Sequence, residues 1–220
     1  LALLLVGIAG CGYDPEADAS KGIIKRDPSG KVEILVLDKE TITDAGLKPL
    51  AEMEGLRNLH MFNVPVSRAD VEHLSGLEKL SSITFESTQI GDDGLRPLQQ
   101  LANLRALFIQ TAPKISDAGM VHVGRMVKLQ SLSLFKVPIT DRGLEHLAGM
   151  TNLKTLHLIM TGITGAGVSH MRNLDSLESL VINGSEINGG GLVHLEGLEN
   201  LKILALNCGG ITAGDLVHLK

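Results

Sequence analysis

Aromatic residues are nearly absent from this sequence of 220 residues, which has no tryptophan, one tyrosine and four phenylalanines. Hydrophobic residues nevertheless make up 44% of the chain. Most globular cores take part of their bulk from aromatic rings, so a core here must be filled by leucine, isoleucine, valine and methionine. A single aliphatic layer that is repeated many times would have this composition.

The sequence also has few cysteines and no excess of positive charge. The two cysteines, Cys11 and Cys208, lie far apart in the sequence, and Cys11 falls in a motif described below, so we expect no structural disulfide. The formal net charge is -5, with acidic and basic residues interspersed. This balance gives no reason to expect nucleic acid as a partner.

Sequence patterns of known catalytic centres are missing as well. The chain has no glycine-rich phosphate loop, no Gly-x-Ser-x-Gly, no His-Glu-x-x-His and no Cys-x-x-Cys. We therefore expect that the protein is not an enzyme and uses no cofactor.

The first eleven residues, LALLLVGIAGC, form an uncharged apolar run that is too short to span a bilayer as a helix. Such a run is typical of a secretory signal. It ends in Ile8-Ala9-Gly10-Cys11, which resembles the bacterial lipobox, and the resemblance implies cleavage before Cys11 and lipidation of that cysteine. We interpret residues 1–11 as a truncated lipoprotein signal segment. The alternative is a buried N-terminal strand with a chance cysteine.

Two short segments separate this run from the main pattern. Residues 12–21, GYDPEADASK, are small, polar and acidic, which is typical of a flexible tether. Residues 22–31 include the turn sequence Asp27-Pro28-Ser29-Gly30 between two strand-like runs. We expect residues 22–31 to form an N-terminal hairpin cap.

From Val32 to Lys220 the sequence aligns with itself in eight copies, of which the last is incomplete. The period is about 24 residues, which lies in the range of known solenoid repeats. The template is LxxLxLxxxxITDxGLxxLxxLxx. The fourth copy has one extra residue near Pro113, between its expected strand and Ile115. One unit cannot bury its leucines alone, so neighbouring units must stack.

The hydrophobic period changes within each copy. Alternation, as at Leu156 and Leu158, predicts a short strand with one buried face. Leucines then fall three apart, which predicts a helical stripe. A hydroxyl or amide residue precedes each expected helix as its N-cap, and a glycine three residues later would let the helix approach its neighbour closely. The expected caps are Thr43, Ser67, Ser116, Thr140, Thr164, Asn188 and Thr212.

Residues 32–220 resemble the leucine-rich-repeat family. The resemblance implies an α/β solenoid shaped like a horseshoe, with a parallel sheet on the concave side and helices on the convex side. The phrase ITDAGL at Ile42–Leu47 is similar to the cysteine-containing subclass found in F-box ubiquitin-ligase adaptors. This chain departs from that subclass because the Cys or Asn position holds Thr88, Thr161 and Ser185. We expect these hydroxyls to satisfy backbone groups of the loop.

The alternation also predicts which side chains face outward on the concave sheet. Three of the four phenylalanines fall there, whereas Phe85 takes a core position. Exposed apolar patches commonly mark interaction sites. We predict that the ligand-binding residues are His60, Phe62, Phe108, Phe135, His157, Ile159 and Met160. Sheet packing or a self-associated dimer could instead cover these side chains.

Six of the eight histidines occur at one position of the repeat, so stacking would align them in a column on the helical side. They are His73, His122, His146, His170, His194 and His218. Such a column could bridge zinc. However, Pro49 and Pro97 replace the histidine in two copies, and no cysteine or carboxylate recurs beside it. We attribute the column to duplication of the phrase Gly-Leu-x-His-Leu and expect no metal site.

These observations favour a non-enzymatic binding module that presents its concave face to a protein or peptide. The lipobox resemblance would place it on the bacterial cell envelope, anchored to a membrane through lipidated Cys11. By analogy, Gly12 after the cysteine fits outer-membrane sorting in an organism with two membranes. One alternative is a structural segment of a larger protein or a self-associating solenoid. A further alternative is a ubiquitin-ligase substrate adaptor. This hypothesis depends only on the resemblance of ITDAGL and would require an F-box upstream.

Overall fold

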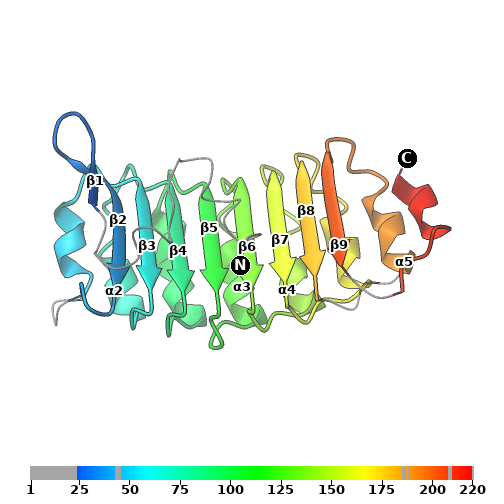
Figure 1. The fold of residues 1–220 in the computed structure, drawn as a ribbon, viewed down its shortest axis with the longest axis horizontal. Helices are drawn as coiled ribbons and strands as arrows, with labels where there is room; N and C mark the ends of the chain where they lie inside the picture. The colour runs from blue at the N-terminus through cyan, green and yellow to red at the C-terminus, as the bar shows by residue number, and fades with distance from the viewer. Residues whose placement is uncertain (1–23, 43–45, 185–186, 188, 208–209, 220) are drawn as a thin grey trace.

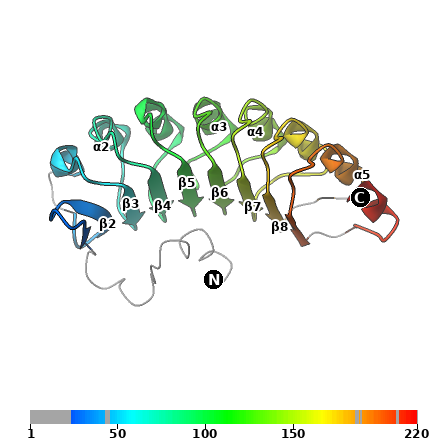
Figure 2. The same cartoon turned by 90° about the horizontal axis from the view of Figure 1, so that it is seen from above.

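The computed structural model describes residues 24–42, 46–184, 187, 189–207 and 210–219. Within them the chain winds through stacked coils, each of which contributes a short strand to one layer and a short helix to the other (Figure 1). Seen from above, the coils form an arc with the helices on the convex side and the strands on the concave side (Figure 2). The predicted α/β solenoid is confirmed.

The concave layer is one nine-stranded sheet whose strand order in space follows the sequence. Its strands are β1 (Ile24–Arg26), β2 (Val32–Asp38), β3 (Asn58–Phe62), β4 (Ser82–Glu86), β5 (Ala106–Gln110), β6 (Ser131–Phe135), β7 (Thr155–Ile159), β8 (Ser179–Asn183) and β9 (Ile203–Asn207). β2 to β9 are parallel, whereas β1 is antiparallel to β2. β1 and the turn after it occupy the segment that we expected as a cap, and the second strand of this hairpin is β2 itself.

Neighbouring parallel strands pair in constant register. Ser82 pairs with Ala106, which in turn pairs with Ser131, so the second step along the chain is longer than the first by a single residue. The extra residue lies in the loop between β5 and the following helix, as the sequence indicated, and Ala112 of this loop is fully buried. Because a slip of one residue would turn every side chain to the opposite face, constant register keeps the aliphatic residues of all coils inside.

The convex layer consists of short α-helices and 3₁₀-helices. The α-helices are α2 (Arg68–Glu72), α3 (Asp117–Gly124), α4 (Asp141–Glu145) and α5 (Gly189–Leu192). The 3₁₀-helices are η3 (Lys48–Glu52), η4 (Asp92–Gln100), η5 (Gly167–Met171), η6 (Val193–Leu195) and η7 (Asp215–Leu219). The apolar residues of this layer recur three apart, as Leu144, Leu147 and Met150 do, and three residues per turn is the 3₁₀ period.

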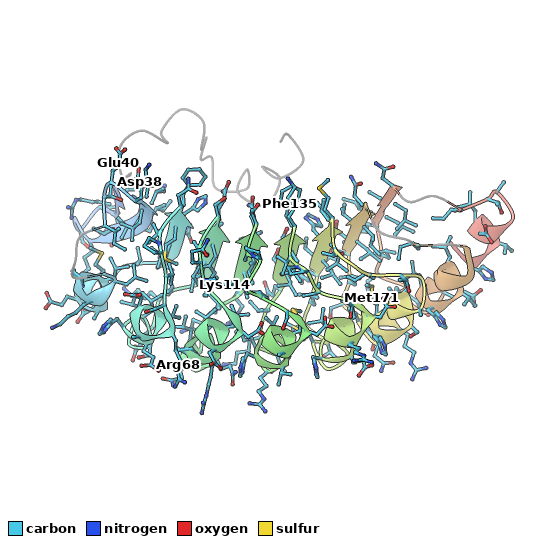
Figure 3. All side chains as sticks on the ribbon, turned by 90° about the horizontal axis from the view of Figure 1, so that it is seen from below. Asp38, Glu40, Arg68, Lys114, Phe135 and Met171 are labelled. Atoms are coloured by element: carbon cyan, nitrogen blue, oxygen red, sulfur yellow. The ribbon has the colours of Figure 1, made fainter. Side chains whose placement is uncertain are left out.

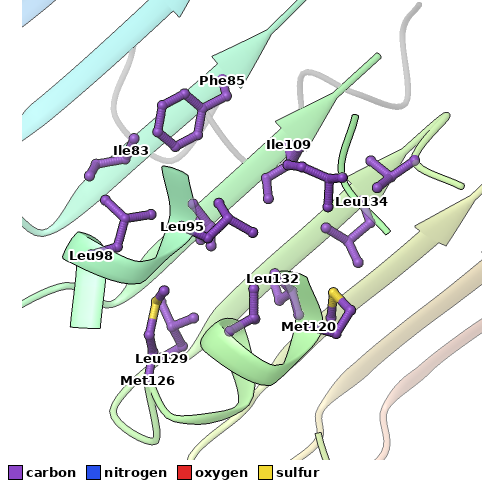
Figure 4. Close-up of a cluster of buried hydrophobic side chains, with 14 of the residues drawn as sticks. Ile83, Phe85, Leu95, Leu98, Ile109, Met120, Met126, Leu129, Leu132 and Leu134 are labelled. Atoms are coloured by element: carbon purple, nitrogen blue, oxygen red, sulfur yellow. The ribbon is translucent and has the colours of Figure 1, made fainter. Parts of the chain in front are cut away.

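The core lies between the two layers. Leu132 and Leu134 of β6 and Met120 of α3 are fully buried and lie in one cluster of aliphatic side chains (Figure 4). Phe85 of β4 also belongs to this core and has no exposed surface, as predicted. Burial of a side chain of this size stabilises the fold by about 1.5 to 3 kcal/mol, so repetition of the layer accounts for most of the stability.

Aspartates at the start of the convex helices join one coil to the next. Asp117 accepts hydrogen bonds from the backbone N–H of Thr140 at 2.7 Å and from its hydroxyl at 2.6 Å. Asp92 accepts the same two bonds from Ser116, and Asp141 from Thr164. The aspartate of the ITDxGL phrase is therefore an acceptor for the N-cap residue of the following coil.

The glycine of the phrase leaves room for this carboxylate. A Cβ atom on Gly143 would lie 2.6 Å from Oδ1 of Asp117, which is closer than carbon and oxygen can approach. The glycine therefore lets its helix approach the neighbouring helix closely, as predicted, because Asp117 and Met120, whose Cγ would lie 3.1 Å from the added Cβ, both belong to α3. The closest group is the side-chain carboxylate.

Most of the predicted caps that the structure describes form as expected. Ser67, Ser116 and Thr140 each accept a hydrogen bond from a backbone N–H in the first turn of their helices. Thr164 accepts one from Ala166, which precedes η5 and is its N-cap residue. In the last coil, Thr212 instead donates both its N–H and its hydroxyl to Asp215, at 2.7 Å each. Expected caps Thr43 and Asn188 lie outside the described residues.

One expectation about the loops is not met. Thr88 stands at the position where the resembling subclass has Cys or Asn, and we expected its hydroxyl to satisfy backbone groups. Thr88 is fully buried, but its Oγ1 has no hydrogen-bond partner. This site therefore carries an unsatisfied buried polar atom.

Candidate functional site: the concave face of the sheet

Three rows of side chains cross the sheet on the face opposite the helices, and we call these rows the concave face. The first row is Ile34, Asn58, Ser82, Ala106, Ser131, Thr155, Ser179 and Ile203. The second row is Val36, His60, Thr84, Phe108, Ser133, His157, Val181 and Ala205, and the third is Asp38, Phe62, Glu86, Gln110, Phe135, Ile159, Asn183 and Asn207. In Figure 3, Asp38 and Phe135 project from the sheet away from the helices.

Five of the predicted ligand-binding residues gather over β5 to β7, and we call them the apolar patch. Phe135 pairs directly with Ile159 across β6 and β7, and His157 lies two residues before Ile159 on the same face. Phe108 pairs with Ser133, so it is diagonal to Phe135. The fifth member, Met160, follows β7 directly and is 54% exposed.

Exposure differs among these residues. Phe108, Phe135 and His157 are half-buried, so each presents part of its side chain to a partner. Ile159 lies in the row where the alternation placed it, but only 8% of its surface is exposed. It stands between Phe135 and Asn183 in the register. Ile159 therefore supports the patch by packing and offers little surface for contact, which corrects the expectation of an open side chain.

The other two predicted residues, His60 and Phe62, stand apart from the patch. Both lie on β3, and β4 separates them from Phe108 with Thr84 and Glu86. Phe62 is 37% exposed. The continuous strip predicted from the sequence is therefore two sites, because β4 contributes polar residues between them.

Formal charge on the concave face is confined to two carboxylates. Among the residues of the three rows, only Asp38 and Glu86 are acidic and none is lysine or arginine. They flank Phe62, because the register aligns Asp38, Phe62 and Glu86 on β2, β3 and β4. We did not select these carboxylates from the sequence, although a search of the third row for charge would have found them.

Both carboxylates have identified partners. The backbone N–H groups of Thr41 and Glu40, each 2.8 Å from Oδ1, lower the pKa of Asp38 and keep it ionised at neutral pH. Glu86 Oε2 lies 3.5 Å from Nε2 of His60. That nitrogen is buried and neither accepts nor donates a hydrogen bond, so the contact with Glu86 is a weak one unless His60 is protonated.

His157 in the apolar patch is held in its neutral form. Burial lowers the pKa of His157, because the charged imidazolium loses hydration there. The patch is therefore uncharged at neutral pH apart from its rim. Lys136, the residue after β6, supplies that rim with its ammonium 5.2 Å from the centre of the Phe135 ring.

A row of left-handed residues borders the third row. Each residue that directly follows β3 to β7 has a positive φ, although none of them is glycine; they are Asn63, Ser87, Thr111, Lys136 and Met160. Each donates its backbone N–H to the last residue of the next strand, as Thr111 does to Phe135 at 2.8 Å. This geometry continues the hydrogen-bond ladder past the strand ends and turns Lys136 and Met160 toward solvent.

The histidine column lies on the convex side, as the repeat predicted. Its members contact neighbouring coils: His122 Nδ1 is 2.9 Å from Nε2 of Gln99, and His218 contacts Glu196. Within the part of the chain that the structure describes, no three His, Cys, Asp or Glu side chains are placed to hold a metal ion.

The expected lipid anchor lies outside the described residues. Residues 1–11 with Cys11 and the tether of residues 12–21 are not among them, and neither is Cys208. No helix in the described ranges has the length and hydropathy needed to cross a membrane.

Comparison with known proteins finds similarity in structure only. No family model and no curated protein matches the chain. An internalin, InlF, from Listeria monocytogenes is 28% identical and covers 79% of this chain and 55% of its own, with a TM-score of 0.58. Internalin C2 from the same organism is 25% identical, with coverages of 73% and 66% and a TM-score of 0.58. The chain therefore spans roughly half to two thirds of these internalins.

A third neighbour is the leucine-rich-repeat ectodomain of a plant receptor kinase, GASSHO1/SCHENGEN3 from Arabidopsis thaliana. It is 16% identical and covers 90% of this chain and 27% of its own, with a TM-score of 0.56. This chain has the leucine-rich-repeat fold. At this identity the plant ectodomain establishes the fold alone, and its structure was solved in complex with CASPARIAN STRIP INTEGRITY FACTOR 2.

These neighbours share the leucine-rich-repeat fold with this chain. In this leucine-rich-repeat solenoid, the apolar patch and the carboxylates around Phe62 are the two features of the concave face that could contact a partner.

Proposed function

We propose that this leucine-rich-repeat protein is a non-enzymatic module that binds a protein or peptide on its concave face and is held on the bacterial cell envelope by lipidated Cys11. The observation that carries the proposal is the apolar patch, in which Phe108, Phe135 and Met160 present surface on the concave side. Half-buried aromatic side chains of this kind are typical of interface hot spots.

The fold favours the same function. A parallel sheet of constant register presents a rigid, evenly spaced surface. The backbone of the sheet would therefore lose little conformational entropy when a partner binds. The plant ectodomain with the same fold is complexed with a second protein. The lipobox resemblance of residues 8–11 supports the anchor.

The test is comparative capture from a bacterial envelope extract. The chain would be immobilised as wild type, as Phe108→Ser with Phe135→Ser, and as Val127→Ser, and the retained proteins would be identified by mass spectrometry. Val127 is a suitable control because it is 48% exposed and lies outside the sheet. A partner kept by wild type and Val127→Ser but lost by the Phe variant supports the proposal. Equal retention by all three would refute it.

A further inference from the structure

We propose that the segment bound by the concave face is extended and carries two anchors: a basic side chain, with arginine best, over Phe62 between Asp38 and Glu86, and an apolar side chain four residues away on the apolar patch. This inference rests on the proposed function and specifies the chemistry of its partner. It follows from the position of charge on the face and from the spacing of its two sites.

The first anchor is an exposed ring between two carboxylates. Phe62 on β3 is 37% exposed, and the register places Asp38 on one neighbouring strand and Glu86 on the other. Adjacent strands lie about 4.8 Å apart, so the backbones of Asp38 and Glu86 are about one strand spacing from that of Phe62 on either side. A ring face flanked in this way attracts a cation through both the π-system and the carboxylates.

Each carboxylate keeps an oxygen for a partner. The two backbone N–H groups that bind Asp38 both use Oδ1, and the hydroxyl of Thr41 also interacts with the carboxylate, which leaves Oδ2 without a backbone donor among the described residues. The Glu86 side chain is 30% exposed, and its contact with His60 at 3.5 Å is long. A guanidinium can stack on the ring and donate to carboxylates in its plane, which a compact ammonium cannot do together.

The rest of the face reinforces this preference. Asp38 and Glu86 are the only charged residues of the three rows, so the face attracts one positive group at Phe62. At the other site, Lys136 lies over Phe135 and would repel a second cation. The face therefore favours a cationic anchor at β3 and a neutral apolar anchor at β6.

The spacing of the two sites selects the spacing in the ligand. Phe62 and Phe135 occupy the same row on β3 and β6, which are three strand spacings or about 14 Å apart. An extended chain rises about 3.3 Å per residue, and residues four apart point to the same side after about 13 Å. A basic residue and an apolar residue four positions later, or in the reverse order, match both sites at once.

The experiment measures fluorescence anisotropy of labelled synthetic peptides titrated with the full 220-residue chain. The reference peptide is Gly-Arg-Ser-Thr-Ser-Leu-Gly. Three variants replace its arginine by glutamate, replace its leucine by serine, or move the leucine one position closer. The reference peptide should bind about tenfold more tightly than the glutamate peptide, which is the expected sum of a cation–π contact and two exposed charge pairs. The reference peptide should also bind more tightly than the peptide with serine in place of leucine and the peptide with the shifted leucine.

Matched protein variants assign the preference to its residues. In Asp38→Asn with Glu86→Gln, the preference for arginine over glutamate should fall to about twofold, because the asparagine retains the acceptor for the loop but both charges are lost. The control Glu52→Gln with Glu199→Gln removes the same charge from exposed positions outside the sheet and should keep the full preference. Circular dichroism would verify that all variants are folded.

The outcomes separate this inference from the proposed function. An equal affinity for the arginine and glutamate peptides, a preference that survives loss of Asp38 and Glu86, or no binding of any peptide at about 1 mM would overturn the inference. The proposed function would still stand in each case if envelope capture depended on Phe108 and Phe135. Loss of that dependence would remove the proposed function, whatever the peptides show.

Discussion

The carboxylate of Asp117 in one coil accepts hydrogen bonds from the backbone N–H and the hydroxyl of Thr140 in the next coil, at 2.7 and 2.6 Å. Stacking of the leucine-rich repeats is therefore not only apolar. Each such carboxylate satisfies the N-cap residue of the following helix, which in turn caps its own first turn. The fold thus depends on a polar link at the convex edge of each interface where the phrase is complete.

A double-mutant cycle between Asp117 and Gly143 should show coupling. Gly143→Ala places a Cβ 2.6 Å from Oδ1 of Asp117 and should destabilise the wild type by about 1 to 3 kcal/mol. In the Asp117→Ala background the carboxylate is gone, so the same substitution should cost at least about 0.5 kcal/mol less. Urea unfolding of the four proteins measures this difference. Strict additivity would show that the glycine serves another purpose.

Acidification should weaken the fold partly through His157. Burial lowers the folded pKa of His157 below its ordinary value of 6.5, so the unfolded chain takes up the proton first as the pH falls. Stability is therefore lost as the pH falls from 6.5 through the folded pKa. Between pH 7.5 and pH 5, the melting temperature of His157→Gln should fall less than the melting temperature of wild type. The variant His73→Gln, at an exposed histidine, serves as control, and an identical fall in all three proteins would contradict the assignment.

Substitutions on the two faces of the sheet should differ in cost. Leu156 is fully buried, so Leu156→Ala should destabilise by about 2 to 5 kcal/mol. Phe108 and Phe135 are half-buried on the concave face, and replacing both by serine should change stability by no more than about 1 kcal/mol. Equilibrium denaturation in urea compares them. A Phe double variant as unstable as the Leu variant would mean that these rings belong to the core.

Glycine should be favoured at the left-handed residue after β5. Thr111 has a φ of 51°, a conformation that costs a β-branched residue about 1 to 2 kcal/mol, and its side chain is exposed. Thr111→Gly should therefore stabilise the protein by about 0.5 to 1 kcal/mol after the greater freedom of the unfolded chain is included. Thr155→Gly, in β7, should instead destabilise it. Thermal melting of both variants gives the sign directly.

Lipidation at Cys11 has a simple chemical signature. When the gene for the complete precursor is expressed in a bacterium that processes lipoproteins, the protein should incorporate labelled palmitate and partition into detergent. Cys11→Ser should abolish both, whereas Cys208→Ser should abolish neither. Label retained by the Cys11 variant would exclude this residue as the anchor.

Much of the fold could be predicted from the sequence. The alternation around Leu156 and the regular recurrence of the template together imply a strand with one buried face and a stack of identical units. The same reasoning placed Phe85 inside and the other phenylalanines outside, which the burial of Phe85 and the exposure of Phe62 bear out. It missed the hydrogen bonds from the aspartate of ITDxGL to the N-cap residue of the next coil, since these contacts join residues of different coils.

The candidate site could be predicted only in part for a related reason. The alternation in the sequence predicted which aromatic residues lie on the concave face. Whether Phe62 and Phe108 form one surface depends on Thr84 and Glu86 between them. The near-complete burial of Ile159 likewise depends on its neighbours rather than on its own position.

The sequence by itself determined the shape of a single coil and the face to which each side chain turns, because periodicity and capping act between residues that are close in the chain. Only the tertiary structure decided that the backbone N–H groups of Glu40 and Thr41 hold the Asp38 carboxylate and that Asp117 meets Thr140. Residues one repeat apart become neighbours only when the coils stack, and the geometry of that stacking sets which charges, rings and hydrogen-bond donors meet.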